Sequence, residues 1–207
     1  VAQKLYESGL ITYMRTDSTK LSSLAINTAK AYITDNYGAD YSRVRQYHTA
    51  ARGAQEAHEA IRPTYIERSG IQGSPEEQKL YELIWKRTIA SQMADAEIEK
   101  TTVNISGSGL DEQFVANGEV VKFDGFIKVY HESTDDDEQM DAEGTRMLPP
   151  ISEGQPLQRR EVSALQRYTQ SPMRYTEASL VHKLEELGIG RPSTYAPTIS
   201  TIQQREY

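Results

Sequence analysis

The chain has 207 residues, 37% of them hydrophobic and none of them cysteine, with a formal net charge of −7. This length and composition allow one large packed domain or about two or three small ones, and the lack of cysteine excludes disulfides and thiolate metal sites. No apolar run approaches the roughly 18 to 20 residues of a membrane span, and no signal peptide is visible, so we expect a cytoplasmic protein with no membrane partner.

The negative charge is concentrated in one stretch. Seven acids and no Lys or Arg lie between Glu132 and Glu143, so the rest of the chain is close to neutral. Such a run most often forms a solvated loop and less often an interaction element. The net charge therefore neither supports nor excludes nucleic acid as a partner.

The first part of the chain has a mostly helical pattern. A short helix is expected from Ala2 to Ser8, followed by an extended segment over Leu10 to Thr16. A second helix is predicted over Leu21 to Tyr37, with Gly38 ending it. Ser74 predicts the start of another helix, because a proline and two acids follow this N-cap residue and apolar positions then recur at helical spacing.

The middle of the chain changes to a strand pattern. Strands are predicted over Thr101 to Ile105, Gln113 to Ala116 and Val120 to Tyr130. The dipeptide Asn117-Gly118 between the last two is typical of a hairpin turn.

After Pro172 the pattern is helical again. A helix capped by Thr176 is predicted over Glu177 to Leu187, and the next one starts near Ser193. The short connection gives a helix-turn-helix shape, which is more often a plain αα-hairpin than a DNA-binding element.

The first segment with useful chemistry is G-L-I-T-Y-M-R-T-D-S, residues 9 to 18. Because side chains alternate along an extended segment, Tyr13, Arg15 and Asp17 are expected on one side of it. A phenol is a poor nucleophile near neutral pH, and a neighbouring guanidinium can favour the phenolate and hold a phosphate. By spacing alone, an ordinary half-buried tyrosine beside a surface ion pair is the simpler interpretation, since Tyr13 is one of 13 tyrosines.

The second segment is Q-E-A-H-E-A-I-R-P, residues 55 to 63. If it is helical, His58 and Arg62 lie on one face and offer two groups suited to a phosphate. His58 and Glu59 also open a metalloprotease H-E-x-x-H pattern, but Arg62 stands where the second histidine is required. A single histidine on a helix is more often structural.

The third segment is G-I-G-R-P-S-T-Y, residues 188 to 195. A helix starting near Ser193 would offer backbone N–H groups to an anion, with Arg191 and Thr194 as further phosphate donors and Tyr195 as a stacking face. The plainer interpretation is a capped helix start after a turn. The P-loop pattern is absent.

In order and wording, these segments resemble the type IA DNA topoisomerases: A-Q-K-L-Y-E-S-G-L-I-T-Y-M-R-T-D-S, then E-A-H-E-A-I-R-P, then E-A-S-L-V-H-K-L-E-E-L-G-I-G-R-P-S-T-Y-A. The resemblance covers nearly the whole chain, is weakest from about residue 107 to 170, and is closer to the topoisomerase I branch than to the topoisomerase III branch. It implies an α+β, multidomain part of the family's toroid. Residues 1–96 would be the helical domain with the tyrosine, 97–172 a β-rich arch segment with the acidic loop, and 173–207 the start of a helical DNA-binding domain.

The resemblance also implies the chemistry. The tyrosine matching Tyr13 would attack one strand of single-stranded or negatively supercoiled DNA, leaving a 5′-phosphotyrosine and a 3′-hydroxyl, and resealing after strand passage would relax supercoils without ATP. Arg15 and His58 would be catalytic beside it. The residues implied to contact DNA are Gln3, Asp17, Arg62, Arg191, Ser193, Thr194 and Tyr195.

One departure from the family pattern concerns metal. The family's Toprim domain binds Mg²⁺ through an acidic cluster and supplies a lysine expected to be the general acid, and nothing in this sequence matches it. The family's cysteine-rich zinc domains also have no counterpart here. The resemblance therefore implies a central fragment of a bacterial, nucleoid-associated enzyme, which binds no metal itself and is incomplete without the remaining domains of its chain.

Two other hypotheses stay open. The chain could act only as a module that grips single-stranded DNA through arginine and aromatic groups. It could also be a structural scaffold, with Tyr13 buried and His58 bonded to backbone. The Y-M-R-T-D-S segment favours the enzyme, because a scaffold has no need of it.

Overall fold

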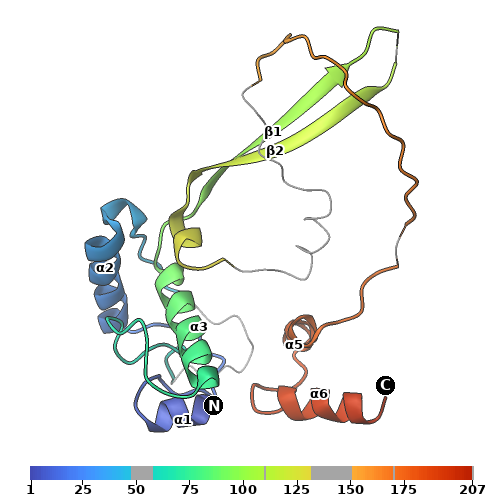
Figure 1. The fold of residues 1–207 in the computed structure, drawn as a ribbon. Coiled ribbons are helices and arrows are strands. Elements are labelled where there is room, and N and C mark those ends of the chain that lie inside the picture. Colours follow the sequence, from blue (N-terminus) through green and yellow to red (C-terminus); the bar gives the residue numbers. More distant parts are fainter. Residues whose placement is uncertain (48–57, 110, 132–150, 170, 207) are drawn as a thin grey trace. The chain divides into compact units, whose positions relative to one another are not determined.

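The computed structural model of the chain describes residues 1–47, 58–109, 111–131, 151–169 and 171–206 (Figure 1). The acidic run of residues 132–143 and the first three residues of the second segment lie outside them. The chain forms two compact units, one of Val1–Glu97, Phe123–Glu132 and Glu177–Tyr207, the other of Ile98–Lys122 and Ser133–Thr176. Helices and a small sheet occur together, which agrees with the expected α+β class. The division into three family domains stays a prediction.

Three α-helices form the body of the first unit, and two begin at hydrogen-bonded caps. They are α1 (Ala2–Glu7), α2 (Ser23–Tyr37) and α3 (Pro75–Ser91), with a 3-10 turn η1 (Ala39–Tyr41) after α2. Ser74 accepts a hydrogen bond from the Glu77 backbone while the Glu77 carboxylate accepts one from the Ser74 backbone, so the predicted start of α3 is confirmed as a capping box. The α2 helix starts two residues later than expected, behind Ser22, and Gly38 ends it at φ 103°.

The core of this unit lies among the three helices. Its most deeply buried side chains include Leu5, Ile33, Ile89 and Met93, each at most 1% exposed. Two polar aromatic groups of α3 fasten the loop that precedes it: the Tyr81 hydroxyl donates to the backbone oxygen of Arg68 at 2.8 Å, and the Trp85 ring nitrogen donates to that of Ile66 at 2.8 Å. The loop after the second segment is therefore fixed to α3.

The sheet is a two-stranded antiparallel hairpin of β1 (Glu97–Ser106) and β2 (Gln113–Phe123). Its register is visible in cross-strand contacts, with Lys100 3.0 Å from Glu119 and Thr102 donating to the Asn117 side chain at 3.0 Å.

The predicted hairpin turn at Asn117-Gly118 is wrong. Both residues lie inside β2, where the Asn117 amide bonds across the sheet instead of closing a turn. The strands are joined by residues 107–112, and Gly109 there has φ 82°, a conformation that favours glycine. The last predicted strand also ends early, because Gly125–Lys128 is a 3-10 turn, η2.

The chain returns from β2 to the first unit next to Gly125, which is tightly packed. Gly125 has φ 48°, and a Cβ there would overlap the backbone oxygens of Ala94 and Asp95. Next to it the Tyr41 hydroxyl donates to Asp124 at 2.6 Å. A substitution at Gly125 would therefore be strained both by its dihedral angles and by its neighbours.

The C-terminal helices are α5 (Glu177–Glu186) and α6 (Tyr195–Gln204). The second begins two residues later than expected, because Thr194 and Tyr195 both donate their backbone N–H groups to the oxygen of Arg191, which forms a turn before the helix. Helices in the described parts of the chain are all too short or too polar to span a lipid bilayer.

A core substitution tests the packing of α2. Ile33 is fully buried, whereas Leu24 on the same helix is 74% exposed. We expect Ile33→Ala to lower the free energy of unfolding by about 2–5 kcal/mol, because it leaves a cavity, and Leu24→Ala to change it little. Urea unfolding followed by circular dichroism measures both. Equal effects of the two substitutions would contradict this packing.

Candidate active site around Tyr13

The segment that carries Tyr13 is held by the segment that carries His58. Ile11 forms an isolated antiparallel bridge with Pro63. The Thr12 backbone N–H donates to the oxygen of Arg62 at 2.9 Å, and that of Thr64 donates to the oxygen of Leu10 at 3.0 Å. The expected extended segment is therefore only a single bridge followed by bends, because its partner pairs with it over so short a stretch.

Burial alternates only in the second half of the bent segment. Thr16 and Ser18 are buried, and the Thr16 hydroxyl accepts a hydrogen bond from the Ser18 backbone at 3.0 Å. Tyr13 and Asp17 are half-buried, and Arg15 is exposed. Thr12 and Met14 are half-buried as well, so burial separates the two predicted sets of side chains only from Arg15 to Ser18.

The ring of Tyr13 lies beside two other rings. Its centroid is 5.1 Å from that of His58, with the planes at 42°, and 5.4 Å from that of Tyr6, edge to face at 73°. The structure therefore brings the histidine of the second segment to the tyrosine of the first.

The helical interpretation of the second segment is wrong for the residues described. Residues 58–63 form a bend and an irregular stretch rather than a helix, because their backbone groups bond to the first segment and to the residues before α2. Thr12 and Ala60 show this, since the Thr12 hydroxyl donates to the Ala60 oxygen at 2.7 Å. His58 reaches Tyr13 through this loop and not through a shared helix face.

Arg62 is used inside the protein. Its side chain is only 13% exposed, forms an ion pair with Glu59 at 2.6 Å and donates to the oxygen of Pro63 at 2.9 Å. Its backbone N–H donates to the Thr12 hydroxyl at 2.9 Å. Arg62 therefore braces the loop, and its predicted contact with DNA stays a prediction.

Glu59 connects the loop to the start of α2. Its second carboxylate oxygen accepts a hydrogen bond from the backbone of Ser22 at 2.6 Å. Burial raises the pKa of the Glu59 carboxyl, but the hydrogen bonds from Arg62 and Ser22 together outweigh burial and leave this pKa below its ordinary value. The carboxylate is thus held in its ionised form by the groups that it connects.

Within the part of the chain that the structure describes, His58 does not show the bonding that the scaffold hypothesis expects. Among the described residues, its Nδ1 atom is buried and has no hydrogen-bond partner. A structural histidine usually satisfies such an atom with a backbone group. The side chain is instead half-buried beside a half-buried phenol.

The third segment also lines a cavity with the first. A hollow of about 370 Å³ in the first unit is lined by Tyr13, Arg15, Thr16, Asp17, Arg191, Pro192 and Ser193. The Thr194 hydroxyl accepts a hydrogen bond from the Arg191 backbone at 2.9 Å. Because Thr194 and Tyr195 also bond to Arg191, two of the backbone donors expected to face an anion close the turn instead.

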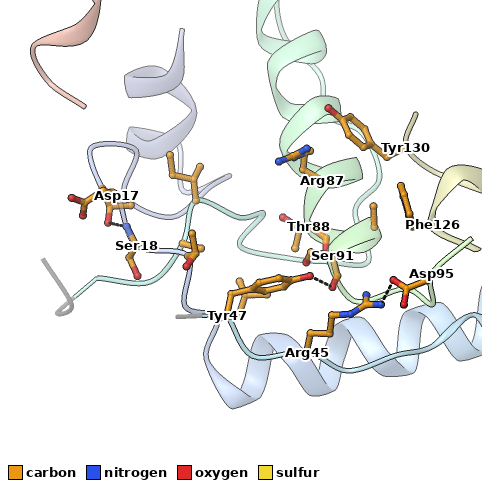
Figure 2. A pocket seen from close by; sticks show the side chains of 16 residues that line it. Asp17, Ser18, Arg45, Tyr47, Arg87, Thr88, Ser91, Asp95, Phe126 and Tyr130 are labelled. Atoms are coloured by element: carbon orange, nitrogen blue, oxygen red, sulfur yellow. Dashed lines mark hydrogen bonds and ion pairs between the residues drawn. The ribbon is translucent and has the colours of Figure 1, made fainter. Parts of the chain in front are cut away.

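A second cavity, of about 750 Å³, has the next residues of the first segment in its wall (Figure 2). Asp17 and Ser18 come from that segment, and Arg87, Thr88 and Ser91 from α3. Thr16 and Asp17 line both cavities. This short stretch is therefore a shared wall rather than part of a solid core.

Gln3, the remaining predicted site residue, lies on α1 and donates to Glu7 at 2.8 Å on an exposed face. A metal site does not fit the described residues, since no three His, Asp or Glu side chains gather among them in a way that could hold an ion.

The whole chain is similar to known DNA topoisomerases. A family model described as DNA topoisomerase matches residues 1–207. The chain belongs to the DNA topoisomerase family. It is 50% identical over its whole length to DNA topoisomerase 1 of Streptomyces coelicolor and 48% identical to that of Zymomonas mobilis, of which it covers 23% and 17%.

The fold comparison agrees. Full-length topoisomerase I from Thermotoga maritima matches 96% of this chain at a TM-score of 0.70 and 34% identity, and the match covers 31% of that chain. The chain thus spans less than a third of these topoisomerase relatives.

Three residues of this candidate site were missed from the sequence. Thr12 and Glu59 lie inside the motifs, but their bonding across segments has no signal in local spacing. Tyr6 lies in the quoted A-Q-K-L-Y-E-S-G stretch, and only the fold brings its ring to Tyr13.

The hydrogen bonds and ion pair of Glu59 make the free energy of unfolding depend on pH. Because the pKa of Glu59 is lowered in the folded chain, its ionised carboxylate stabilises the fold above the unfolded pKa of about 4.3, and this contribution is lost as the pH falls through the folded-state value. We expect Glu59→Gln to be less stable than wild type at about pH 7 and the difference to narrow as the pH falls below about 4.3 and through the lowered folded-state pKa. Urea unfolding across this range measures the difference. Glu67→Gln, at an exposed residue of the nearby loop, is the control; a Glu59→Gln deficit independent of pH would contradict the role of the charge.

Proposed function

We propose that this chain carries the DNA-cleaving tyrosine of a type IA topoisomerase and that Tyr13 is the nucleophile. One observation carries the proposal: the half-buried Tyr13 ring lies 5.1 Å from His58, with exposed Arg15 two residues along the same segment. This arrangement occurs in a member of the DNA topoisomerase family. Phenol, imidazole and guanidinium are a nucleophile, a proton-transfer group and a phosphate-binding group, three of the groups that phosphoryl transfer to tyrosine uses.

The reaction balances without an external energy source. The Tyr13 oxygen attacks the phosphorus of one strand, the bond from phosphorus to the 3′-oxygen breaks, and a 5′-phosphotyrosine forms. The phenol proton leaves and the 3′-oxygen gains one, giving a 3′-hydroxyl. Because the phosphotyrosine keeps the energy of the phosphodiester, attack by that hydroxyl reseals the strand without ATP, and passage of another strand in between relaxes negative supercoils.

The side chains have distinct roles in this scheme. The Arg15 guanidinium holds the scissile phosphate and stabilises the charge that develops on its oxygens. His58, beside the phenol, hydrogen-bonds to the same phosphate or moves a proton there. Gln3, Asp17 and Arg62 belong to the surrounding site.

The third segment binds the strand next to the break. Arg191, Ser193 and Thr194 offer donors to phosphates and Tyr195 a face for a base. Arg191 and Ser193 line the same hollow as Tyr13, which supports a DNA path through it. DNA is thus the substrate and partner that we propose.

The complete enzyme needs more than these residues. We infer that Mg²⁺ and the general acid belong to a Toprim region elsewhere in the complete protein, because the chain spans only 17% to 28% of its curated relatives. The 207 residues alone are then incomplete for catalysis.

The nucleophile is tested in the complete protein. We expect Tyr13→Phe to form no covalent adduct with a labelled single-stranded oligonucleotide, because the attacking oxygen is gone. His58→Ala should keep the adduct but slow its formation by about 10²- to 10⁴-fold, as for loss of a proton-transfer group. Tyr65→Phe is the matched control, since Tyr65 is an exposed tyrosine whose ring lies against Arg68 instead.

Denaturing gel electrophoresis measures the adduct after rapid quenching. An undiminished adduct in Tyr13→Phe would contradict the assignment. The isolated 207 residues with Mg²⁺ should form no adduct and relax no plasmid; activity there would show that the catalytic groups are misplaced.

Binding is tested separately. We expect Arg191→Ala to weaken single-stranded DNA binding and to lower the slope of log affinity against log salt by roughly one unit or less, as expected for one lost phosphate contact. Tyr13→Phe should bind nearly as wild type does, because it removes a hydroxyl and no charge. Fluorescence anisotropy at several salt concentrations measures both, and an unchanged slope in Arg191→Ala would remove the third segment from the DNA path.

A further inference from the structure

The backbone around Tyr13 is fixed more firmly than its ring. Hydrogen bonds hold Thr12 to Arg62 on one side and Ser18 to Thr16 on the other. The phenol ring projects from the bend between them with two side-chain torsions of its own. Its direction is therefore set by the groups that touch the ring.

One of those groups is Tyr6, at an edge-to-face angle of 73° and a centroid distance of 5.4 Å. This is the geometry that aromatic pairs prefer, because the positive edge of one ring meets the negative face of the other. His58 touches the same phenol ring, but it also has a role at the phosphate. Tyr6 also touches this ring, and it has no proposed role in DNA binding or proton transfer.

Tyr6 is itself held in place by the fold of α1. The preceding residue, Leu5, is 1% exposed and anchors the helix in the core, and Lys4 forms an ion pair with Glu77 at the start of α3. After the helix the chain reverses at Gly9, whose φ is 68°. Its backbone N–H donates to the backbone oxygen of Tyr6 at 2.8 Å. This reversal returns the chain so that residues 6 and 13 meet.

We infer that Tyr6 is a positioning residue for the nucleophile: its ring holds the Tyr13 ring in the direction from which the phenol oxygen can attack in line. The inference rests on the proposed role of Tyr13. Tyr6 is 41% exposed and so contributes little to the core, which means that its contact matters for the site rather than for folding. Correct orientation of a reacting group contributes to rate, and misplacement of about 1 Å can be costly.

The experiment compares Tyr6→Ala, Tyr6→Phe and Tyr65→Ala in the complete protein. The single-turnover rate of adduct formation is measured at saturating oligonucleotide, and the Kd by anisotropy. We expect Tyr6→Ala to lower the rate by about two- to tenfold, the value of one aromatic pair, with an unchanged Kd. Tyr6→Phe keeps the ring and should cleave at the wild-type rate, as should Tyr65→Ala, which removes an exposed tyrosine of the same unit.

The outcomes separate the alternatives. A weaker Kd with an unchanged rate in Tyr6→Ala would make Tyr6 a stacking platform for a base and overturn the inference, as would a wild-type rate with a wild-type Kd. A slow Tyr6→Phe would assign the effect to the hydroxyl and also overturn it. If Tyr6→Ala unfolds, Tyr6→Leu keeps apolar bulk without a ring, and a wild-type rate there has the same consequence. An adduct in Tyr13→Phe refutes the proposed nucleophile, independently of every Tyr6 result.

Discussion

The candidate site depends on one short backbone pairing between segments that are about fifty residues apart. Thr12 and Arg62 exchange a hydrogen bond at 2.9 Å, Thr64 bonds to Leu10 at 3.0 Å, and the Thr12 hydroxyl adds bonds to Ala60 and Arg62. Without this pairing, Tyr13 and His58 would belong to two unrelated loops. With it, an imidazole and a phenol become neighbours, and the chemistry proposed for the site becomes possible.

The pairing is in turn supported by the helices. Glu59 joins the second segment to the cap of α2 through Ser22, and Trp85 of α3 holds the backbone of Ile66 just beyond it. The first support is a loop side chain that reaches the backbone of a helix cap, and the second is a helix side chain that reaches the backbone of a loop. The site proposed to take a DNA strand has to be accessible, so its precision comes from such bonds to a packed scaffold.

Local signals in the sequence predicted the parts that local physics decides. The capping box at Ser74 and the glycine after Tyr37 bound their helices as expected, because cap geometry involves only residues within a few positions. Contacts between residues far apart in the sequence determine the features that were predicted wrongly or missed. Asn117 bonds across a strand instead of turning, and the irregular stretch after His58 follows bonds to other segments. The contact between the rings of Tyr6 and Tyr13 depends on the chain reversal at Gly9, and no spacing rule in the sequence predicts this contact.

The two arginines of the motifs show how the fold divides similar residues. By residue type alone, Arg15 and Arg62 could each bind a phosphate. In the structure Arg62 is 13% exposed and is paired with Glu59, so moving it to a phosphate would leave a partly buried carboxylate without its partner. Arg15 is exposed, two residues from the phenol, and can approach a phosphate without breaking the ion pair between Arg62 and Glu59. Breaking the ion pair between Arg62 and Glu59 would cost free energy. This cost favours Arg15 as the guanidinium proposed at the scissile phosphate, and it favours Arg62 as the residue that holds its neighbours in place.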